Sequence, residues 1–209
     1  SFLVPTNKSK TTKIISVTNQ KGGVGKTTTT INLAAALSQL KKKVLIVDLD
    51  PQGNASTGLG VEVEDRELST YEFLVEGVPL EKVTMETEIS GLNIVPATID
   101  LSSADIDLIS NEKRSHLLHA ALRKKQQDKQ KYDYILIDCP PSLNILTVNA
   151  MVASHSVLIP LQSEFFALEG LSQLLLTVKE VRQTANENLR VEGIVLTMFD
   201  GRNNLSKQV

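Results

Sequence analysis

The sequence predicts an α/β protein with a doubly wound, mainly parallel β-sheet that carries helices on both faces. Short apolar runs rich in β-branched residues recur along the chain, and helical patterns separate most of them. Parallel strands and their crossover helices alternate in this way. The length of 209 residues suits one ordinary domain. We therefore expect one domain over residues 13–209, preceded by a flexible arm over residues 1–12.

The elements can be justified in chain order. Residues 13–18 form a β-branched run that is typical of a short strand, and residues 27–40 repeat apolar and small side chains at helical spacing. Residues 43–49 are almost continuously apolar, which indicates a strand buried on both faces of a parallel sheet. Weak periodicity over 61–91 leaves the element boundaries open there. The same patterns predict further strands over 92–95, 134–137, 157–160 and 193–198, and further helices over 69–76, 101–109, 113–131, 143–153 and 168–185.

Composition excludes several classes of protein. The 22 Lys and Arg residues are balanced by 24 Asp and Glu residues, so the net charge of −2 excludes a basic nucleic-acid footprint over the whole chain but allows a local patch. The single cysteine, Cys139, can form neither an internal disulfide nor a cysteine-only metal site. It fits a reducing cytosol, so we expect a cytoplasmic protein. No apolar run approaches the roughly 20 residues that cross a bilayer.

A glycine-rich segment joins the first expected strand to the first expected helix. Glycines let backbone N–H groups point at phosphate oxygens, and the positive end of the helix adds to the attraction. Lys26 supplies a cation for the phosphates, and the Thr27 hydroxyl can bind Mg²⁺. The usual P-loop pattern would place glycine at position 20, where this chain has Gln20. The expected nucleotide-binding residues are Lys21, Gly22, Gly23, Val24, Gly25, Lys26, Thr27 and Thr28.

The alternative for this segment is a glycine-rich turn with solvated lysines. We favour a nucleoside triphosphate site, because strand, glycines, Lys-Thr and helix follow one another in the order that phosphate binding needs.

Two expected strands end in aspartates. Asp48 and Asp50 close the second strand, at the edge of the sheet where α/β proteins bind ligands, and carboxylates there suit Mg²⁺ binding and orientation of a water. A turn-capping aspartate before Pro51 is the alternative. Asp138 ends the apolar run 134–138, which is the Walker B arrangement. Cys139, which follows it, is interpreted as a small buried residue rather than a nucleophile.

The residues Lys21-Gly22-Gly23-Val24-Gly25-Lys26-Thr27 resemble the deviant Walker A motif of the ParA/MinD group of ATPases. The resemblance implies a fold of the P-loop NTPase type, ATP or ADP with Mg²⁺ as cofactors, and dimerisation in the presence of ATP. It implies that Lys21 reaches across the dimer to the phosphates bound by the other subunit. Lys21, Lys26 and Asp50 would then be the catalytic residues.

The same resemblance assigns further roles at the site. Asp50 matches the residue that positions the attacking water, and Asp48 matches the residue that supports the phosphate-loop lysine and the metal shell. Thr27 would bind Mg²⁺, with Asp138 and Asp48 acting through water. The two switch segments of the family correspond to Asp50, Pro51 and Asn54, and to Pro140 and Pro141.

Further stretches resemble the chromosomal ParA (Soj) branch of the group: residues 19–21, 48–54, 96–98, 164–171 and 196–200. The branch partitions chromosomes or plasmids. Membership would imply an ATP-bound homodimer that binds DNA without sequence preference, at the nucleoid, and a ParB-type centromere-binding partner that stimulates hydrolysis. Arg202 matches a DNA-contacting position, and Lys207 is a second candidate; the alternative for Arg202 is a solvated loop arginine.

Two alternatives stay open: a nucleotide-gated binding module with little turnover, and a MinD-like membrane-cycling regulator of cell division. MinD-like proteins carry a C-terminal amphipathic membrane helix, of which this sequence shows no sign, so we expect no stable membrane association. Val209 falls inside the helix that follows the Arg202 loop in the family. We therefore expect the C-terminal part of the family's domain, with its adenine loop and part of its dimer and DNA surfaces, to be missing.

Overall fold

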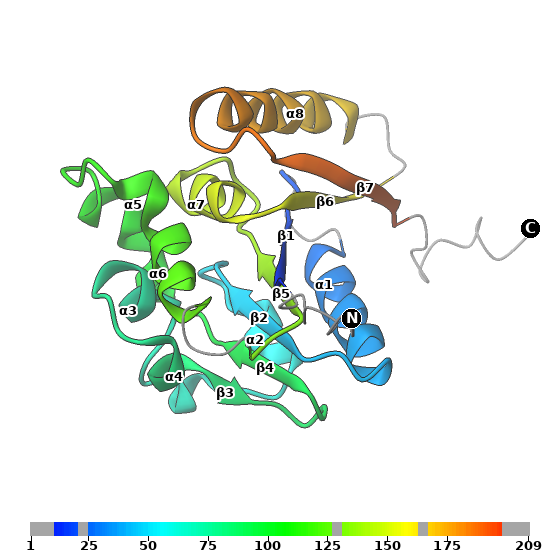
Figure 1. The fold of residues 1–209 in the computed structure, drawn as a ribbon, viewed down its shortest axis with the longest axis vertical. Coiled ribbons are helices and arrows are strands. Elements are labelled where there is room, and N and C mark those ends of the chain that lie inside the picture. The colour runs from blue at the N-terminus through cyan, green and yellow to red at the C-terminus, as the bar shows by residue number, and fades with distance from the viewer. Residues whose placement is uncertain (1–10, 21–24, 127–130, 163–166, 198–209) are drawn as a thin grey trace, which may run out of the picture.

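The computed structural model of the chain describes residues 11–20, 25–126, 131–162 and 167–197. Its centre is a seven-stranded sheet with the strand order β3-β4-β2-β5-β1-β6-β7 (Figure 1). Every neighbouring pair is parallel except β3 and β4, which are antiparallel. The strands are β1 (Lys13–Val17), β2 (Val44–Asp48), β3 (Met85–Glu86), β4 (Leu92–Val95), β5 (Tyr134–Asp138), β6 (Ser156–Leu161) and β7 (Arg190–Leu196). The expected doubly wound, mainly parallel sheet is confirmed.

Strand β1 lies between β5 and β6, and the chain winds away from it in both directions. Because β1, β2 and β5 are parallel and in register, their carboxyl ends meet at one edge of the sheet. Asp138 pairs with Val17 on one side and with Asp48 on the other. This edge is where ligands bind in open α/β sheets.

Helices cover both faces of the sheet. Helices α1 (Lys26–Gln39) and α2 (Asn54–Gly58) pack on one face, and the remaining α-helices pack on the other. Figure 1 shows α8 above β6 and β7, beside α7. The helices of the second face are α3 (Thr70–Val75), α4 (Leu80–Val83), α5 (Ala104–Asp107), α6 (Leu117–Gln126), α7 (Ile145–Ala153) and α8 (Ala167–Thr184).

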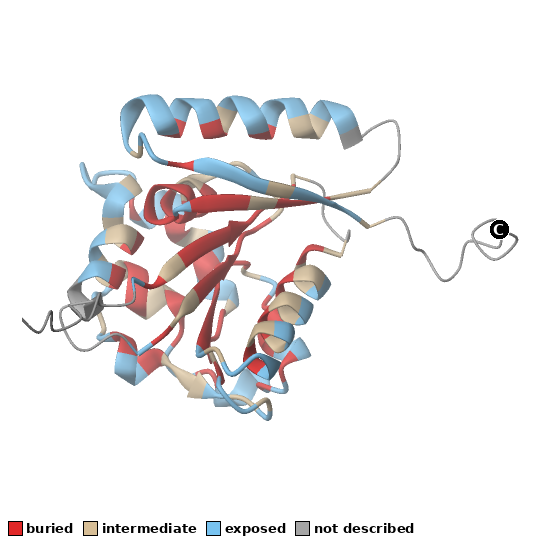
Figure 2. Ribbon diagram, turned by 45° about the vertical axis from the view of Figure 1, so that its right-hand side comes forward, coloured by how far each residue is buried: buried red, intermediate tan, exposed pale blue. Residues whose placement is uncertain are grey.

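Strand β2 illustrates why the central strands are apolar throughout. Val44 and Ile46 join the core under α1 and α2, whereas Leu45 and Val47 join the core under the opposite helices. Alternate side chains of a strand point to opposite faces, so a strand covered on both sides needs apolar residues at every position. Figure 2 shows buried residues filling the central strands, while β7 and the outer side of α8 are exposed.

The structure differs from the expected elements where the chain is locally irregular. The region 101–109 contains the end of a 3-10 helix (Ile99–Ser103) and the four-residue α5, and the helix expected over 113–131 begins with a 3-10 turn (Arg114–His116) before α6. Helix α2 and strand β3 carry no clear periodicity in the sequence. A third 3-10 helix covers Val63–Asp65.

The flexible arm expected over residues 1–12 falls mostly outside the described residues. Thr12, however, is buried, and its Oγ1 donates a hydrogen bond to the carbonyl of Tyr132 at 2.6 Å. Thr12 therefore packs against the folded domain just before β1 begins. In the part of the chain that the structure describes, no helix has the length and apolar character needed to span a membrane.

Candidate functional site

The sequence-predicted site residues that the structure describes converge at the carboxyl edge of the sheet. Gly25, Lys26, Thr27 and Thr28 lie at the start of α1, Asp48 and Asp50 at the end of β2, and Asp138 at the end of β5. Pro51 precedes α2, Asn54 is its first residue, and Pro140 and Pro141 follow β5. The expected roles of Lys21, Gly22, Gly23 and Val24, and of Arg202 and Lys207, concern positions outside the described residues.

Lys26 lies at the centre of this cluster. Its Nζ is 2.8 Å from Oδ1 of Asp138 and 3.7 Å from Oδ2 of Asp50, and its side chain is only 7% exposed. Burial by itself would lower the pKa of Lys26, but attraction from Asp138 and Asp50 outweighs it and raises the pKa. The site therefore holds a buried ammonium group that stays charged.

Asp138 receives three side-chain donors. Besides Lys26, the hydroxyl of Thr27 donates to its Oδ2 at 3.0 Å, and the hydroxyl of Thr30 donates to its Oδ1 at 3.1 Å. The sequence reasoning missed Thr30. Its spacing of four residues from Lys26 on the same helix is the signal that could have found it, because such residues share one face.

Asp48 is completely buried, and its described hydrogen bonds run toward α2. Its Oδ2 accepts from the backbone N–H of Ser56 at 3.0 Å and from the Ser56 hydroxyl at 2.7 Å, while its Oδ1 accepts from the N–H of Asp50 at 3.1 Å. Burial, and then the neighbouring charge of Asp138, raise the pKa of Asp48 to about 7. Its expected role beside the lysine and the metal stays a prediction.

Asp50 lies in the tight turn between β2 and α2. Its Oδ1 accepts a hydrogen bond from the backbone N–H of Gln52 at 3.0 Å. Its other oxygen, Oδ2, faces Lys26. Gly53 then caps α2 with a φ of 64°, in the left-handed region that favours glycine. The turn thus places the Asp50 carboxylate beside the start of α1.

The start of α1 suits an anion. Its N-cap, Gly25, has a φ of 67° and has no side chain with which to satisfy the N–H groups of the first turn. The first turn also carries no acidic residue. Unsatisfied N–H groups and the positive end of the helix dipole attract phosphate.

The residues after β5 support the site without reacting in it. Cys139 is completely buried, and its burial raises the pKa of the thiol, so this cysteine is a packing residue rather than a nucleophile. Pro140 is buried and Pro141 is half-buried. Their fixed φ angles restrict the loop that leaves Asp138.

These oxygens fit a magnesium nucleotide. The Thr27 hydroxyl and the Asp138 carboxylate lie together beside Lys26, and oxygen ligands are what Mg²⁺ prefers. The described residues contain no group of three or more His, Cys, Asp or Glu side chains that could enclose a metal. Mg²⁺ with a nucleotide does not need one, since phosphates and waters supply most of its ligands. Together the fold and this site define a P-loop nucleotide-binding protein.

Comparisons with known proteins identify the family. Residues 12–191 match the family described as an AAA domain. The chain is 52% identical to the sporulation initiation inhibitor protein Soj of Bacillus subtilis over 197 residues, which cover 94% of this chain and 77% of that protein. It is 50% identical to the chromosome partitioning protein ParA of Caulobacter vibrioides, with 94% and 73% of the chains covered. The chain belongs to the ParA/Soj family of chromosome-partitioning ATPases.

Solved structures confirm the fold. The structure of cobyrinic acid a,c-diamide synthase from Mycobacterium smegmatis, with bound ADP and magnesium, has a TM-score of 0.85 and 39% sequence identity, and the match covers 95% of this chain and 79% of that one. A synthase of this fold has a different activity from a partitioning protein, so function has to be argued from the site.

Proposed function

We propose that this protein is a partitioning ATPase that uses Mg²⁺-dependent binding and hydrolysis of ATP as a switch. The observation that carries the proposal is the contact of one buried carboxylate, Asp138, with both Lys26 and Thr27. This contact joins the phosphate loop to the neighbouring strand, where a triphosphate and its metal need a cation, a hydroxyl and a carboxylate together.

Each residue then has a role at the phosphates. Lys26 and the backbone N–H groups of the loop would bind the triphosphate. Thr27 would hold Mg²⁺ directly, and Asp138 and Asp48 would hold it through water. Bound Mg²⁺ would neutralise charge on the phosphate oxygens. Asp50 orients the attacking water, because its carboxylate lies at the edge of the site beside Lys26.

The cycle that follows from family membership extends beyond the described site. ATP would bring two copies together, with Lys21 of each contacting the phosphates held by the other, and the dimer would bind DNA without sequence preference. A ParB-type partner would stimulate hydrolysis and release the DNA. The support for this cycle is the 50–52% identity to Soj and ParA. Arg202 and Lys207 remain the proposed DNA contacts.

The residue that tests the proposal is Asp50. In an Asp50→Ala variant we expect ATP to bind with nearly unchanged affinity, because Lys26 keeps its contact with Asp138, while hydrolysis falls about 100-fold or more. Binding is measured with a fluorescent ATP analogue, and hydrolysis by release of phosphate in a single turnover with DNA and the partner protein present.

The matched control is Gln52→Ala in the same turn. Its side chain is exposed and only its backbone N–H contacts Asp50, so this variant should hydrolyse ATP at the wild-type rate. Equal rates for wild type and Asp50→Ala would remove Asp50 from the mechanism. Absence of phosphate release from the wild type would instead favour a binding module that does not turn over.

A further inference from the structure

A buried arginine contacts the segment that follows Asp50. Arg66 comes directly after the 3-10 helix Val63–Asp65 and is only 7% exposed. Its guanidinium donates to the Val61 carbonyl from Nε at 3.2 Å and from Nη2 at 2.6 Å. It also donates to the Ala97 carbonyl from Nη1 at 3.1 Å and to the Thr57 hydroxyl from Nη2 at 3.0 Å. These four hydrogen bonds share three acceptors, all neutral oxygens: one in α2 (Thr57), one shortly after it (Val61) and one after β4 (Ala97).

The same guanidinium packs directly on the turn that holds Asp50. A Cβ atom built on Gly53 would lie 2.5 Å from Nη1 of Arg66 and 3.2 Å from the Ala97 carbonyl oxygen. The backbone of Gly53 is in turn hydrogen-bonded to Asp50, because its N–H donates to the Asp50 carbonyl at 2.8 Å. Arg66 therefore touches the backbone at the point where the Asp50 turn passes into α2.

A second set of bonds anchors α2 at the same place. The Ser56 hydroxyl donates to Asp48 at 2.7 Å and accepts from the N–H of Ala97 at 3.0 Å. The N–H of Ala97 is thus bonded to α2 through Ser56, and its carbonyl is bonded to Arg66. Ala97 lies just after β4 and is completely buried, so it anchors both Ser56 and Arg66 to the core.

Helix α2 needs such external support. It has five residues, and an isolated helix of that length is unstable because the cost of nucleation is not recovered. Its position, and that of the Asp50 turn before it, therefore depends on the contacts made by Ser56 and Arg66. Arginine suits this task, because its planar group directs several N–H donors in fixed directions and stays charged.

We propose that Arg66 is a positioning residue for hydrolysis: it clamps residues 50–58 against Ala97 so that the Asp50 carboxylate is held beside Lys26. This role rests on the proposed ATPase function. Arg66 itself contacts neither Lys26 nor Asp138, so its loss should affect the placement of Asp50 more than the binding of phosphate.

The test compares Arg66→Ala and Arg66→Lys with the wild-type protein in ATP affinity and single-turnover hydrolysis, at a temperature where circular dichroism shows every variant to be folded. We expect hydrolysis by Arg66→Ala to fall about ten-fold or more, since small displacements of a catalytic group carry large rate penalties, while ATP affinity changes less than about three-fold. Arg66→Lys keeps the positive charge but loses the planar set of N–H donors. Its hydrolysis rate should therefore lie nearer to that of Arg66→Ala than to that of the wild type. The control is Arg182→Ala, at an exposed position in the last turn of α8, which should behave as wild type.

Thr57→Ala provides a second variant in case Arg66→Ala does not fold. Thr57 is exposed and accepts only one of the four hydrogen bonds, so this variant should fold and hydrolyse ATP about two- to three-fold more slowly. Wild-type rates in both Arg66→Ala and Thr57→Ala would overturn the clamp and leave the ATPase function intact. A wild-type protein that releases no phosphate would overturn the ATPase function, and with it the clamp.

Discussion

At the scale of single residues, three aspartates at one edge of the sheet have different properties because their neighbours differ. Burial raises the pKa of Asp138, although the Lys26 ammonium and the hydroxyls of Thr27 and Thr30 oppose this rise. Asp48 is completely buried, and this burial, followed by the neighbouring charge of Asp138, raises its pKa to about 7. Asp50 is buried as well, but its Oδ2 lies 3.7 Å from Lys26 Nζ, farther than the Asp138 carboxylate. Residue type alone predicts none of these differences.

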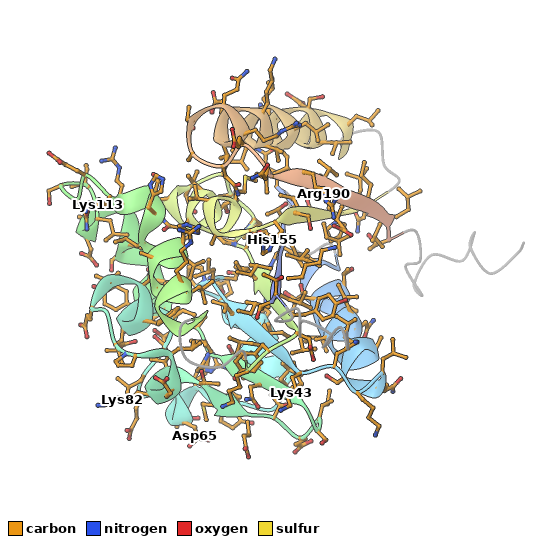
Figure 3. The ribbon with its side chains drawn as sticks, viewed as in Figure 1. Lys43, Asp65, Lys82, Lys113, His155 and Arg190 are labelled. Atoms are coloured by element: carbon orange, nitrogen blue, oxygen red, sulfur yellow. The ribbon has the colours of Figure 1, made fainter. Side chains whose placement is uncertain are left out.

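The prediction at this scale concerns His155 and the pH dependence of stability. This histidine follows α7 and lies near Arg190, as Figure 3 shows, and its Nδ1 accepts the backbone N–H of Ile14 at 2.9 Å. Partial burial of the ring is the largest cause that lowers its pKa below the usual 6.5, and the charges of Lys13 and Arg190 lower it further. Protonation of Nδ1 would also break the bond to Ile14. His155, His119 and Arg123 line one small pocket of about 100 Å³.

The sign of the pH effect follows from proton binding. The unfolded histidine takes up its proton at a higher pH than the folded one, so the free energy of unfolding falls as the pH is lowered through about 6.5. A His155→Gln variant should lose this part of the pH dependence. Urea unfolding of both proteins on either side of this pH measures it, and parallel pH profiles would contradict the prediction.

At the scale of elements, the caps decide where several short helices begin. Ser69 and Glu72 form a capping box at the start of α3, and the Asn144 side chain accepts from two N–H groups at the start of α7. Buried Asn149 then joins α7 to α6, because its Oδ1 accepts from the N–H of Leu118. Periodicity in the sequence locates the longer helices, whereas α2 and α5 are too short to show it.

The capping box of α3 can be tested directly. Replacing Ser69 with Ala removes the hydroxyl that accepts from Tyr71 and donates to Glu72, so we expect a loss of about 1 kcal/mol in the free energy of unfolding. Ser172→Ala is the control. Ser172 is exposed within α8 and bonds only the carbonyl four residues earlier, so that change should cost less than about 0.5 kcal/mol. Equal costs in chemical denaturation would argue against the cap.

At the scale of the whole molecule, the sheet separates the apolar residues into clusters on its two faces. Leu136 of β5 packs with Ile46 and Ala34 under α1, whereas Ile135 and Ile137 face the opposite helices. A third cluster joins α8 to β6 and α7. Lys82, Asp65 and Lys113 lie at the edge of the molecule in Figure 3. Completely buried apolar side chains such as Leu45, Ile46 and Leu136 belong to the central strands, and burial of apolar surface is the dominant favourable contribution to folding.

Central packing gives the last prediction. Leu136 is completely buried, so Leu136→Ala should lower the free energy of unfolding by about 2–5 kcal/mol through lost contacts and a residual cavity. Leu176 on α8 is 62% exposed, so Leu176→Ala should change the free energy of unfolding by less than about 0.5 kcal/mol. The two variants are compared by urea denaturation with circular dichroism. A similar loss in both would mean that β5 is not the centre of the core.

The sequence alone is enough to predict the parallel sheet and to place Lys26, Thr27 and Asp138 at one site. Hydrophobic periodicity, glycine spacing and the order of motifs are local properties, and the carboxyl ends of parallel strands must meet at one edge. Sequence similarity then extends the interpretation to the ParA/Soj family.

Tertiary structure alone decides the remaining features. Arg66 looks like an ordinary solvated charge in the sequence, but it is buried because Thr57, Val61 and Ala97 bring their oxygens around it. Strand β3 runs antiparallel to β4 because only residues 87–91 connect the two strands, too few for the crossover that a parallel pair needs. The bonds of Thr30 and Ser56 likewise depend on partners distant in the chain, which no local pattern records. A group's burial and partners are set by how separate segments pack, and these determine its charge and its chemistry.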